Sequence, residues 1–154
     1  MDTTLVGAFG SSAQATFKEM FGLEAIAAAP RDLGSQEEHS WDITGLIGLA
    51  GEAQGIVALR LTHGLAVNLL ASTGVTAGGE KEERELEGGL VGEMINIIAG
   101  HATSSVADLN MEIAPPVVVR GPNHRIGWPS IGPVVAIDFK LPGGSFEIDL
   151  CVKR

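Results

Sequence analysis

Cysteine is nearly absent from this chain of 154 residues, and basic side chains are scarce. The single cysteine, Cys151, cannot form an internal disulfide and has no second cysteine near it for a zinc site, so the sequence favours a reducing compartment. Ten lysines and arginines face nineteen aspartates and glutamates, and the resulting formal charge of −9 disfavours nucleic-acid binding. An acidic chain of this kind favours instead a basic patch on a protein partner.

The sequence also lacks the pattern of a leader or a membrane span. Residues 1–30 have no basic start, and Lys18, Glu19 and Glu24 interrupt their apolar patches, which predicts neither a signal peptide nor a membrane-spanning helix. The expected location is therefore the cytoplasm. The most economical organisation is one domain over 1–154, large enough to bury roughly 70% of the surface of the unfolded chain.

Hydrophobic periodicity and turn residues predict a mixture of helices and strands. Apolar residues at helical spacing indicate a helix over 4–22, capped by Gly22, and a shorter helix over 63–73. Segments in which apolar and polar residues alternate, joined in pairs by glycine turns, indicate two hairpins. The Pro115-Pro116 pair interrupts one expected strand and suits an edge or a bulge. The expected strands cover 40–49, 54–61, 111–120, 134–141 and 145–153, with loops over 31–39, 74–84 and 121–132.

The order of helix, strand and hairpin occurs twice, which suggests an internal repeat. The segment 22–27 (Gly-Leu-Glu-Ala-Ile-Ala) parallels 110–115 (Asn-Met-Glu-Ile-Ala-Pro). The alternative is two unrelated amphipathic helices before two ordinary hairpins. The register of the repeat places Leu5 where Glu93 stands and Ala8 where Asn96 stands, so the first copy lacks a polar pair.

The most informative stretch is a long amphipathic helix predicted over 85–109. Glu93 and Asn96 lie one turn apart on its outer face, together with Gly89, Gly100 and Ser104. Glycines are unusual there, because each costs roughly 1 kcal/mol relative to alanine in a helix. The inner face carries the apolar residues Leu86, Leu90, Val91, Met94, Ile95, Ile98, Ala102, Val106 and Leu109.

Two explanations fit these glycines. They permit the close approach of another backbone, which would make the outer face a docking groove that contains a carboxylate and a carboxamide. Alternatively, they permit close packing of another element of the same chain, with Asn96 as a buried and internally bonded residue. On spacing alone, the second explanation is favoured.

The Glu93-x-x-Asn96 pair, followed by Gly100 on a long helix, resembles the CheX family of chemotaxis phosphatases, relatives of CheC and FliY. The resemblance covers the first helix, the first hairpin, and the long helix with the strands after it. It implies an α/β (α+β) fold with helices packed on an antiparallel sheet. It also implies a homodimer formed through sheet edges.

The resemblance also implies a function. Members of this family hydrolyse the aspartyl phosphate of the response regulator CheY, and CheX-like proteins keep one Glu/Asn site. By matching the motif, Glu93 is expected to engage the active-site lysine of the regulator, and Asn96 to position the attacking water. No metal is expected on this chain, because the Mg²⁺ belongs to the partner regulator. The partner-binding groove is expected to comprise Gly89, Gly92, Gly100 and Ser104.

Two positions depart from the fuller family motif, Asp/Ser-x-x-x-Glu-x-x-Asn. Gly89 stands four residues before Glu93, and the downstream proline matches Pro115 or Pro116 only with a shifted spacing. Two other functions stay open. One is a non-catalytic module that binds a regulator, and the other is a structural relative of the flagellar switch proteins.

Other signals in the sequence favour ordinary structural roles. The glycines at 45, 48, 51 and 55 lie in a hairpin pattern and are interpreted as turn glycines, not as a nucleotide-binding loop. The histidines at 39, 63, 101 and 124 stand singly and lack metal-ligand spacing. The charged run over 80–87 is interpreted as a solvated helix start. Trp41 and Trp128 are interpreted as core or loop anchors.

Overall fold

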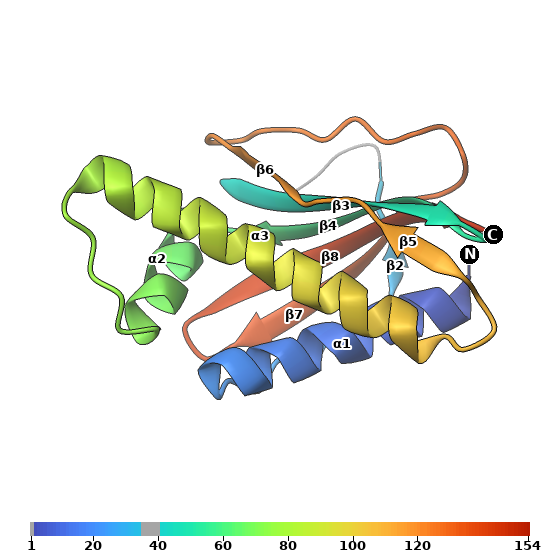
Figure 1. Ribbon diagram of the computed structural model, residues 1–154, viewed down its shortest axis with the longest axis horizontal. Coiled ribbons are helices and arrows are strands. Elements are labelled where there is room, and N and C mark those ends of the chain that lie inside the picture. The colour runs from blue at the N-terminus through green and yellow to red at the C-terminus, as the bar shows by residue number, and fades with distance from the viewer. Residues whose placement is uncertain (1, 35–40) are drawn as a thin grey trace.

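The computed structural model describes residues 2–34 and 41–154, which form three helices packed on one face of an eight-stranded antiparallel sheet (Figure 1). The fold class expected from the sequence is confirmed. None of the helices in these ranges is long and apolar enough to cross a membrane. The helices are α1 (Thr3–Phe21), α2 (His63–Ser72) and α3 (Glu80–Ser105). The strands are β1 (Ile26–Ala27), β2 (Arg31–Asp32), β3 (Ile43–Gly51), β4 (Gln54–Leu61), β5 (Met111–Ile113), β6 (Val117–Arg120), β7 (Val135–Leu141) and β8 (Gly144–Lys153).

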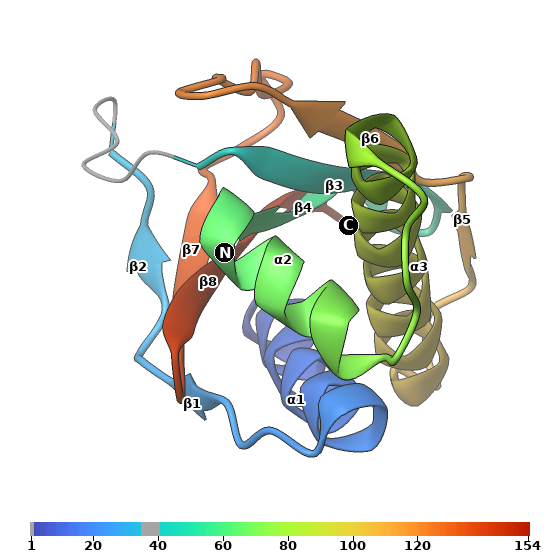
Figure 2. The same ribbon diagram turned by 90° about the vertical axis from the view of Figure 1, so that its left-hand side faces the viewer.

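Four long strands occupy the centre of the sheet, and four short strands form its edges. The order is β1, β7, β8, β4, β3, β5, with β2 also on β7 and β6 also on β3. Figures 1 and 2 show the helices on one side of this sheet and the segment that follows β6 on the other side. The proline pair at 115 and 116 separates β5 from β6, so the interrupted strand lies at an edge, as predicted.

The hydrophobic core lies between the helices and the sheet. Phe17 of α1 stacks on Phe146 of β8, with ring centroids 4.1 Å apart, and Phe146 stacks on Phe139 of β7 at 4.5 Å. All three rings are buried, so they join the first helix to the centre of the sheet. Gly22 ends α1 with a φ of 66°, and its N–H bonds to the carbonyl of Lys18, which confirms the predicted helix cap.

The two halves of the chain are related by an approximate twofold arrangement around the sheet centre. The strands after α1, β1 and β2, pair with β7 of the second hairpin. The strands after α3, β5 and β6, pair with β3 of the first hairpin. Each half therefore supplies edge strands to the hairpin of the other half, and the predicted repeat is confirmed.

The register of this repeat is two residues away from the predicted one. An offset of 86 residues brings β1 onto 112–113 and β2 onto 117–118, inside β5 and β6. The predicted offset of 88 would bring β1 onto 114–115, between those strands. The offset of 86 also brings buried positions of α1 onto buried positions of α3, as in Leu5 onto Val91 and Ala13 onto Ala99.

The predicted equivalences of Leu5 with Glu93 and of Ala8 with Asn96 are therefore wrong. Leu5 is fully buried, whereas Glu93 is exposed. In the observed register Gly7 stands where Glu93 stands, and Gly10 stands where Asn96 stands. The first copy still lacks a polar pair, because it has glycine at both positions.

α3 begins at Glu80, within the predicted connector, and ends at Ser105 instead of continuing to 109. Its early start follows from local bonding, because the carboxylate of Glu82 accepts a 2.9 Å hydrogen bond from the backbone N–H of Gly78 just before the helix. The acidic first turn also lies at the positive end of the helix dipole.

The loop predicted over 31–39 is only partly correct. Arg31 and Asp32 form β2, because they pair with Ala136 and Val135 of β7. The prediction of a loop over 35–39, which includes His39, and of a strand start at Ser40 lies outside the described residues.

Candidate functional site

A glycine in β3 allows α3 to lie close to the sheet. A Cβ atom at Gly45 would lie 3.0 Å from Cγ2 of Ile95 and 3.2 Å from the carbonyl oxygen of Val91. Only glycine leaves room for the helix backbone at this distance. The interpretation of Gly45 as a turn glycine is therefore wrong, and so is that of Gly48, which also lies within β3.

α1 holds α3 from the side. The hydroxyl of Ser12 donates a buried 2.7 Å hydrogen bond to the carbonyl oxygen of Ile98. Small side chains line the contact between the two helices, where Ala13, Ala99 and Ala102 are all fully buried. The sheet and α1 thus cover two sides of α3 and fix its rotation, which determines the side chains that face outward.

Glu93 and Asn96 lie on the outward side of α3. Glu93 is exposed and Asn96 is half-buried. Their spacing of three residues brings their Cβ atoms to about 5–6 Å from each other. Within the described part of the chain, neither side chain has a hydrogen-bond or ion-pair partner. The explanation of Asn96 as a buried and internally bonded residue is therefore not supported.

The predicted groove glycines fall into two groups. Cβ atoms at Gly89 and at Gly100 would meet nothing within 4 Å, and Ser104 is exposed further along the same face. Gly92 is buried instead, because a Cβ atom there would lie 3.4 Å from Val118 of β6. Packing within the chain thus accounts for Gly92. The other three positions carry no large side chain, so the surface of α3 beside the polar pair is unobstructed by them.

This arrangement suits recognition of a polar group on another molecule. A carboxylate accepts hydrogen bonds and pairs with cations, and a carboxamide both donates and accepts. The two groups stand side by side on a rigid helix, so a single partner group can meet both of them. Among the described residues, no three His, Cys, Asp or Glu side chains are placed to hold a metal ion.

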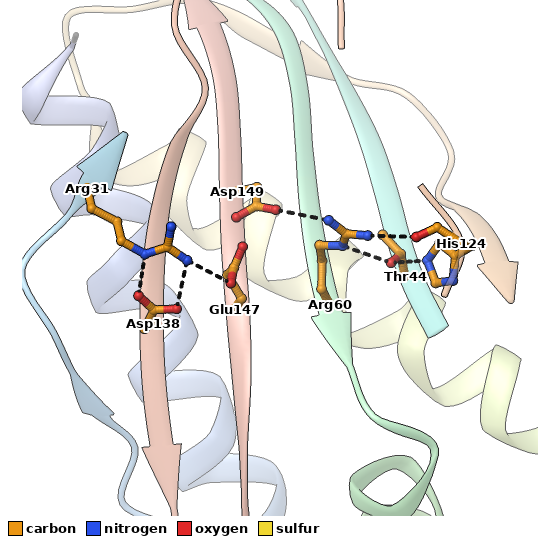
Figure 3. Close-up of polar contacts among 7 residues, drawn as sticks. All are labelled: Arg31, Thr44, Arg60, His124, Asp138, Glu147 and Asp149. Carbon is orange, nitrogen blue, oxygen red and sulfur yellow. Dashed lines mark hydrogen bonds and ion pairs between the residues drawn. The ribbon is translucent and has the colours of Figure 1, made fainter. Parts of the chain in front are cut away.

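A second polar cluster lies on the sheet face opposite the helices (Figure 3). The fully buried Arg60 donates to the carbonyl of His124 at 3.3 Å and lies 3.6 Å from the carboxylate of Asp149. The imidazole of His124 lies 2.6 Å from the hydroxyl of Thr44. These contacts tie the segment after β6 to the sheet, so the cluster has a structural role.

The edge of this cluster is formed by a bridging arginine. Arg31 of β2 donates to Asp138 at 2.7 Å and to Glu147 at 3.2 Å, which joins the short edge strand to β7 and β8 (Figure 3). The bond to Asp138 and the two carboxylates raise the pKa of Arg31. The guanidinium stays charged, and it holds β2 on the sheet.

Glu87 is buried, although the charge pattern predicts a solvated helix start over 80–87. It is 1% exposed and accepts a 2.6 Å hydrogen bond from Arg120 of β6. A signal is present in the sequence, because Glu87 precedes the buried Val91 by one helical turn and therefore falls on the inner face.

The family model described as "Chemotaxis phosphatase CheX" matches residues 43–140, which span β3 to β7 and include the whole of α3. The chain belongs to the CheX family. No curated protein matches the sequence. The membership predicted from the Glu93 and Asn96 pair is thereby confirmed.

Solved structures agree with membership of the CheX family over the whole chain. A CheC-like superfamily protein from Shewanella sp. PV-4 is 25% identical, with a TM-score of 0.87 and coverage of 100% of both chains. The chemotaxis protein CheX of Vibrio vulnificus is 29% identical, with a TM-score of 0.85, over 97% of this chain and 99% of that chain.

A third solved structure is a complex of CheX with CheY, BeF3 and Mg²⁺ from Borrelia burgdorferi. It is 20% identical to this chain, with a TM-score of 0.81, and the match covers 97% of each chain. At this identity the likeness shows a common fold with the CheX of that complex.

Proposed function

We propose that this protein accelerates hydrolysis of the aspartyl phosphate of a CheY-type response regulator. The observation that carries the proposal is the outward-facing pair on α3, where Glu93 and Asn96 stand one turn apart without partners in the described chain. Membership of a family described as chemotaxis phosphatases supports it. The relative from Borrelia burgdorferi forms a complex with CheY, which supports the same class of partner.

Asn96 is the residue proposed to position the attacking water. Hydrolysis requires a water held in line with the phosphorus and the leaving carboxylate oxygen. The amide N–H₂ of Asn96 donates to the water while its carbonyl oxygen accepts from it, which fixes two directions of the water at once. The water oxygen bonds to phosphorus, the bond from phosphorus to the aspartyl oxygen breaks, and inorganic phosphate leaves.

Glu93 is proposed to bind the regulator's active-site lysine. An ion pair between a partly desolvated lysine and this carboxylate would place α3 against the phosphorylation site. Gly89 and Gly100, which flank the pair without side chains, would let the backbone of the regulator approach the helix. The Mg²⁺ ion of the reaction is proposed to belong to the regulator, so this chain contributes positioning groups only.

The proposal includes one site per chain. The equivalent positions on α1 are Gly7 and Gly10, which supply neither a carboxylate nor an amide. We also propose a cytoplasmic homodimer formed through sheet edges. Support comes from two apolar side chains on opposite edges, Ile26 of β1 at 71% exposed and Val117 of β6 at 59% exposed. Sedimentation of the purified protein as a monomer at micromolar concentration would refute the dimer.

The experiment that tests catalysis measures the decay of an acetyl-phosphate-labelled CheY-type regulator with and without this protein. We expect Asn96→Ala to slow the stimulated decay about 100-fold while binding persists, because the water loses its orientation. Glu93→Ala should weaken binding and turnover together. Asn68→Ala on α2 and Glu19→Ala on α1, both exposed, are matched controls that should match the wild type.

The alternative outcomes separate the functions that the sequence left open. Binding of the phosphorylated regulator without faster decay would replace catalysis with a recognition role. If the Asn96→Ala and Glu93→Ala variants both accelerate decay of the phosphorylated regulator as much as the wild type does, the pair has no part in the mechanism.

A further inference from the structure

A pocket of about 600 Å³ opens where α2, the start of α3 and the end of β6 meet. It lies on a different side of α3 from Glu93 and Asn96, and the proposed phosphatase site does not use it. Its walls carry the carboxylates of Asp42, Glu80, Glu83 and Glu87 and the guanidinium groups of Arg84 and Arg120, a net charge of −2.

Glu87 is the buried member of this group. It is 1% exposed, and its Oε1 accepts a 2.6 Å hydrogen bond from Arg120. Its Oε2 is buried as well and has no hydrogen-bond partner among the described residues. A buried carboxylate oxygen without a donor carries an uncompensated loss of hydration, so a ligand that brings an N–H group to this oxygen would be stabilised there.

The surroundings of Glu87 are held by bonds from three elements. Arg120 of β6 also donates to the carbonyl of Arg84 on α3 at 2.8 Å, and the backbone N–H of His63 on α2 donates to Asp42 at 2.8 Å. The imidazole of His63, which is 58% exposed, lies 3.7 Å from Glu87 Oε1, and Glu87 itself lines the pocket.

The chemistry of the pocket selects the class of ligand. Its negative charge disfavours anions, and no three metal-ligating side chains gather in the described part of the chain. A cation that fits must therefore bring its own N–H donors. The volume lies within the range of small-molecule sites. We propose that this pocket binds an organic cation, whose guanidinium or ammonium group donates to Oε2 of Glu87 while Glu80 and Glu83 attract it.

Butylguanidinium and butylurea are the probes that test this proposal. They share size and shape but differ in charge, and binding to the full chain is followed by amide chemical shifts. We expect butylguanidinium to shift residues around 42, 63, 80–87 and 120–122 and to saturate with a Kd of about 1 mM. The urea should bind about tenfold more weakly, because its hydrogen bond to the carboxylate lacks charge assistance.

Three variants locate the binding group. Glu87→Gln should weaken butylguanidinium binding about tenfold. Since Glu87 also anchors Arg120, Glu83→Gln provides an independent test, because its side chain has no partner in the described chain, and it should weaken binding about threefold. Glu85→Gln, an exposed carboxylate on α3 outside the pocket, is the matched control and should leave the Kd unchanged.

A capped Gly-Arg-Gly peptide separates two sources of the same chemistry. Equal binding of the peptide would point to a basic side chain of a protein, whereas exclusion of the peptide with retained butylguanidinium binding would point to a free small molecule. The proposal is overturned if both probes bind equally. It is also overturned if shifts spread over the acidic surface, or if Glu85→Gln weakens binding as much as Glu83→Gln.

Discussion

α1 and α3 occupy equivalent places in the two halves of the molecule, yet of the two helices α3 alone carries the polar pair of the proposed site. Gly7 and Glu93 are both exposed at equivalent positions, and Gly10 and Asn96 are both half-buried. The two halves therefore share the same helix orientation. They differ in the side chains that this orientation displays, which indicates that a site in this fold depends on a few residues placed on a common scaffold.

The sheet beneath the two helices differs as well. Gly45 pairs with Val118 beneath α3, whereas Val135 pairs with Asp32 at the equivalent place in the other half. The close seating of α3 on β3 thus depends on a residue that the other half has replaced by valine. The comparison separates two requirements of the proposed site: the polar pair itself and the seating of the helix that carries it.

The largest effect is expected when Gly45 of the α3 half is replaced by valine, the residue at the equivalent place in the α1 half. Gly45→Val would place side-chain atoms against Ile95 and the backbone of Val91, so α3 must shift. We expect the free energy of unfolding in urea to fall by about 2–3 kcal/mol, and the stimulated decay of the phosphorylated regulator to fall with it.

Gly48→Ala is the control for this change, because its Cβ atom would lie 3.6 Å from Ala114, an ordinary contact. It should leave stability and turnover near those of the wild type. Equal losses for both variants would mean that a side chain at either of these two glycines disturbs the sheet, and that the seating of α3 has no special importance.

A smaller effect is expected from filling the open glycine positions on each helix. Gly100→Gln and Gly7→Gln should each raise the free energy of unfolding by roughly 0.5–1 kcal/mol, because glutamine is a better helix former than glycine. Only Gly100→Gln should reduce turnover, by about tenfold, since it obstructs the proposed groove. A Gly100→Gln protein with normal turnover would place the regulator elsewhere.

α1, unlike α3, begins with a side-chain cap, and the contribution of this cap to stability depends on pH. Asp2 caps α1, and its bond to Arg154 keeps the pKa of its carboxyl below the usual value, with a further contribution from the backbone N–H of Leu5. Because the pKa is lowered on folding, this stabilisation is present above about pH 4 and is lost as the pH falls through the lowered pKa.

We therefore expect Asp2→Asn to reduce the free energy of unfolding by about 0.5–1 kcal/mol at pH 7. The difference should shrink as the pH falls below about 4 and through the lowered pKa, in urea titrations from pH 7 to pH 2.5. A difference that persists at the acid end would assign the effect to packing instead of charge.

The smallest effect on turnover is expected from moving the polar pair to α1. Gly7→Glu with Gly10→Asn fits sterically, because the nearest atom to a Cβ at position 10 is 3.5 Å away and position 7 is open. In an Asn96→Ala background we expect no recovery of phosphatase activity, since Gln14 stands on α1 where α3 has Gly100. Recovered activity would show that the pair alone is sufficient.

The sequence predicted the fold class, the Gly22 cap of α1 and both hairpins, because local periodicity and turn residues determine these features. The register of the repeat could not be read correctly, since it depends on pairing between strands far apart in the chain. The early start of α3 was missed because Glu82 reaches back to Gly78, a bond that charge patterning alone does not indicate. The strand at Arg31 depends on β7 and the bridge to Asp138.

The outward position of the Glu93 and Asn96 pair follows from the helical period, and family resemblance gave its expected role. Spacing alone sets Gly92 apart from the outer stripe of α3, but its packing partner could not be anticipated, because only the folded chain brings Val118 against it. The pocket around Glu87 was missed for the same reason, since its walls come from α2, α3 and β6. Residues on one helix are predictable from spacing, whereas a site built from several elements requires the tertiary structure.

The exchange of edge strands between the halves has a consequence for folding. Among the described strands, neither hairpin is flanked by one from its own half, so neither half can complete its share of the sheet without the other. Such pairing joins strands that are far apart in the chain, and the entropic cost of closing the long loops between them slows folding. The half without the polar pair is thus required for the folding of the half that carries it.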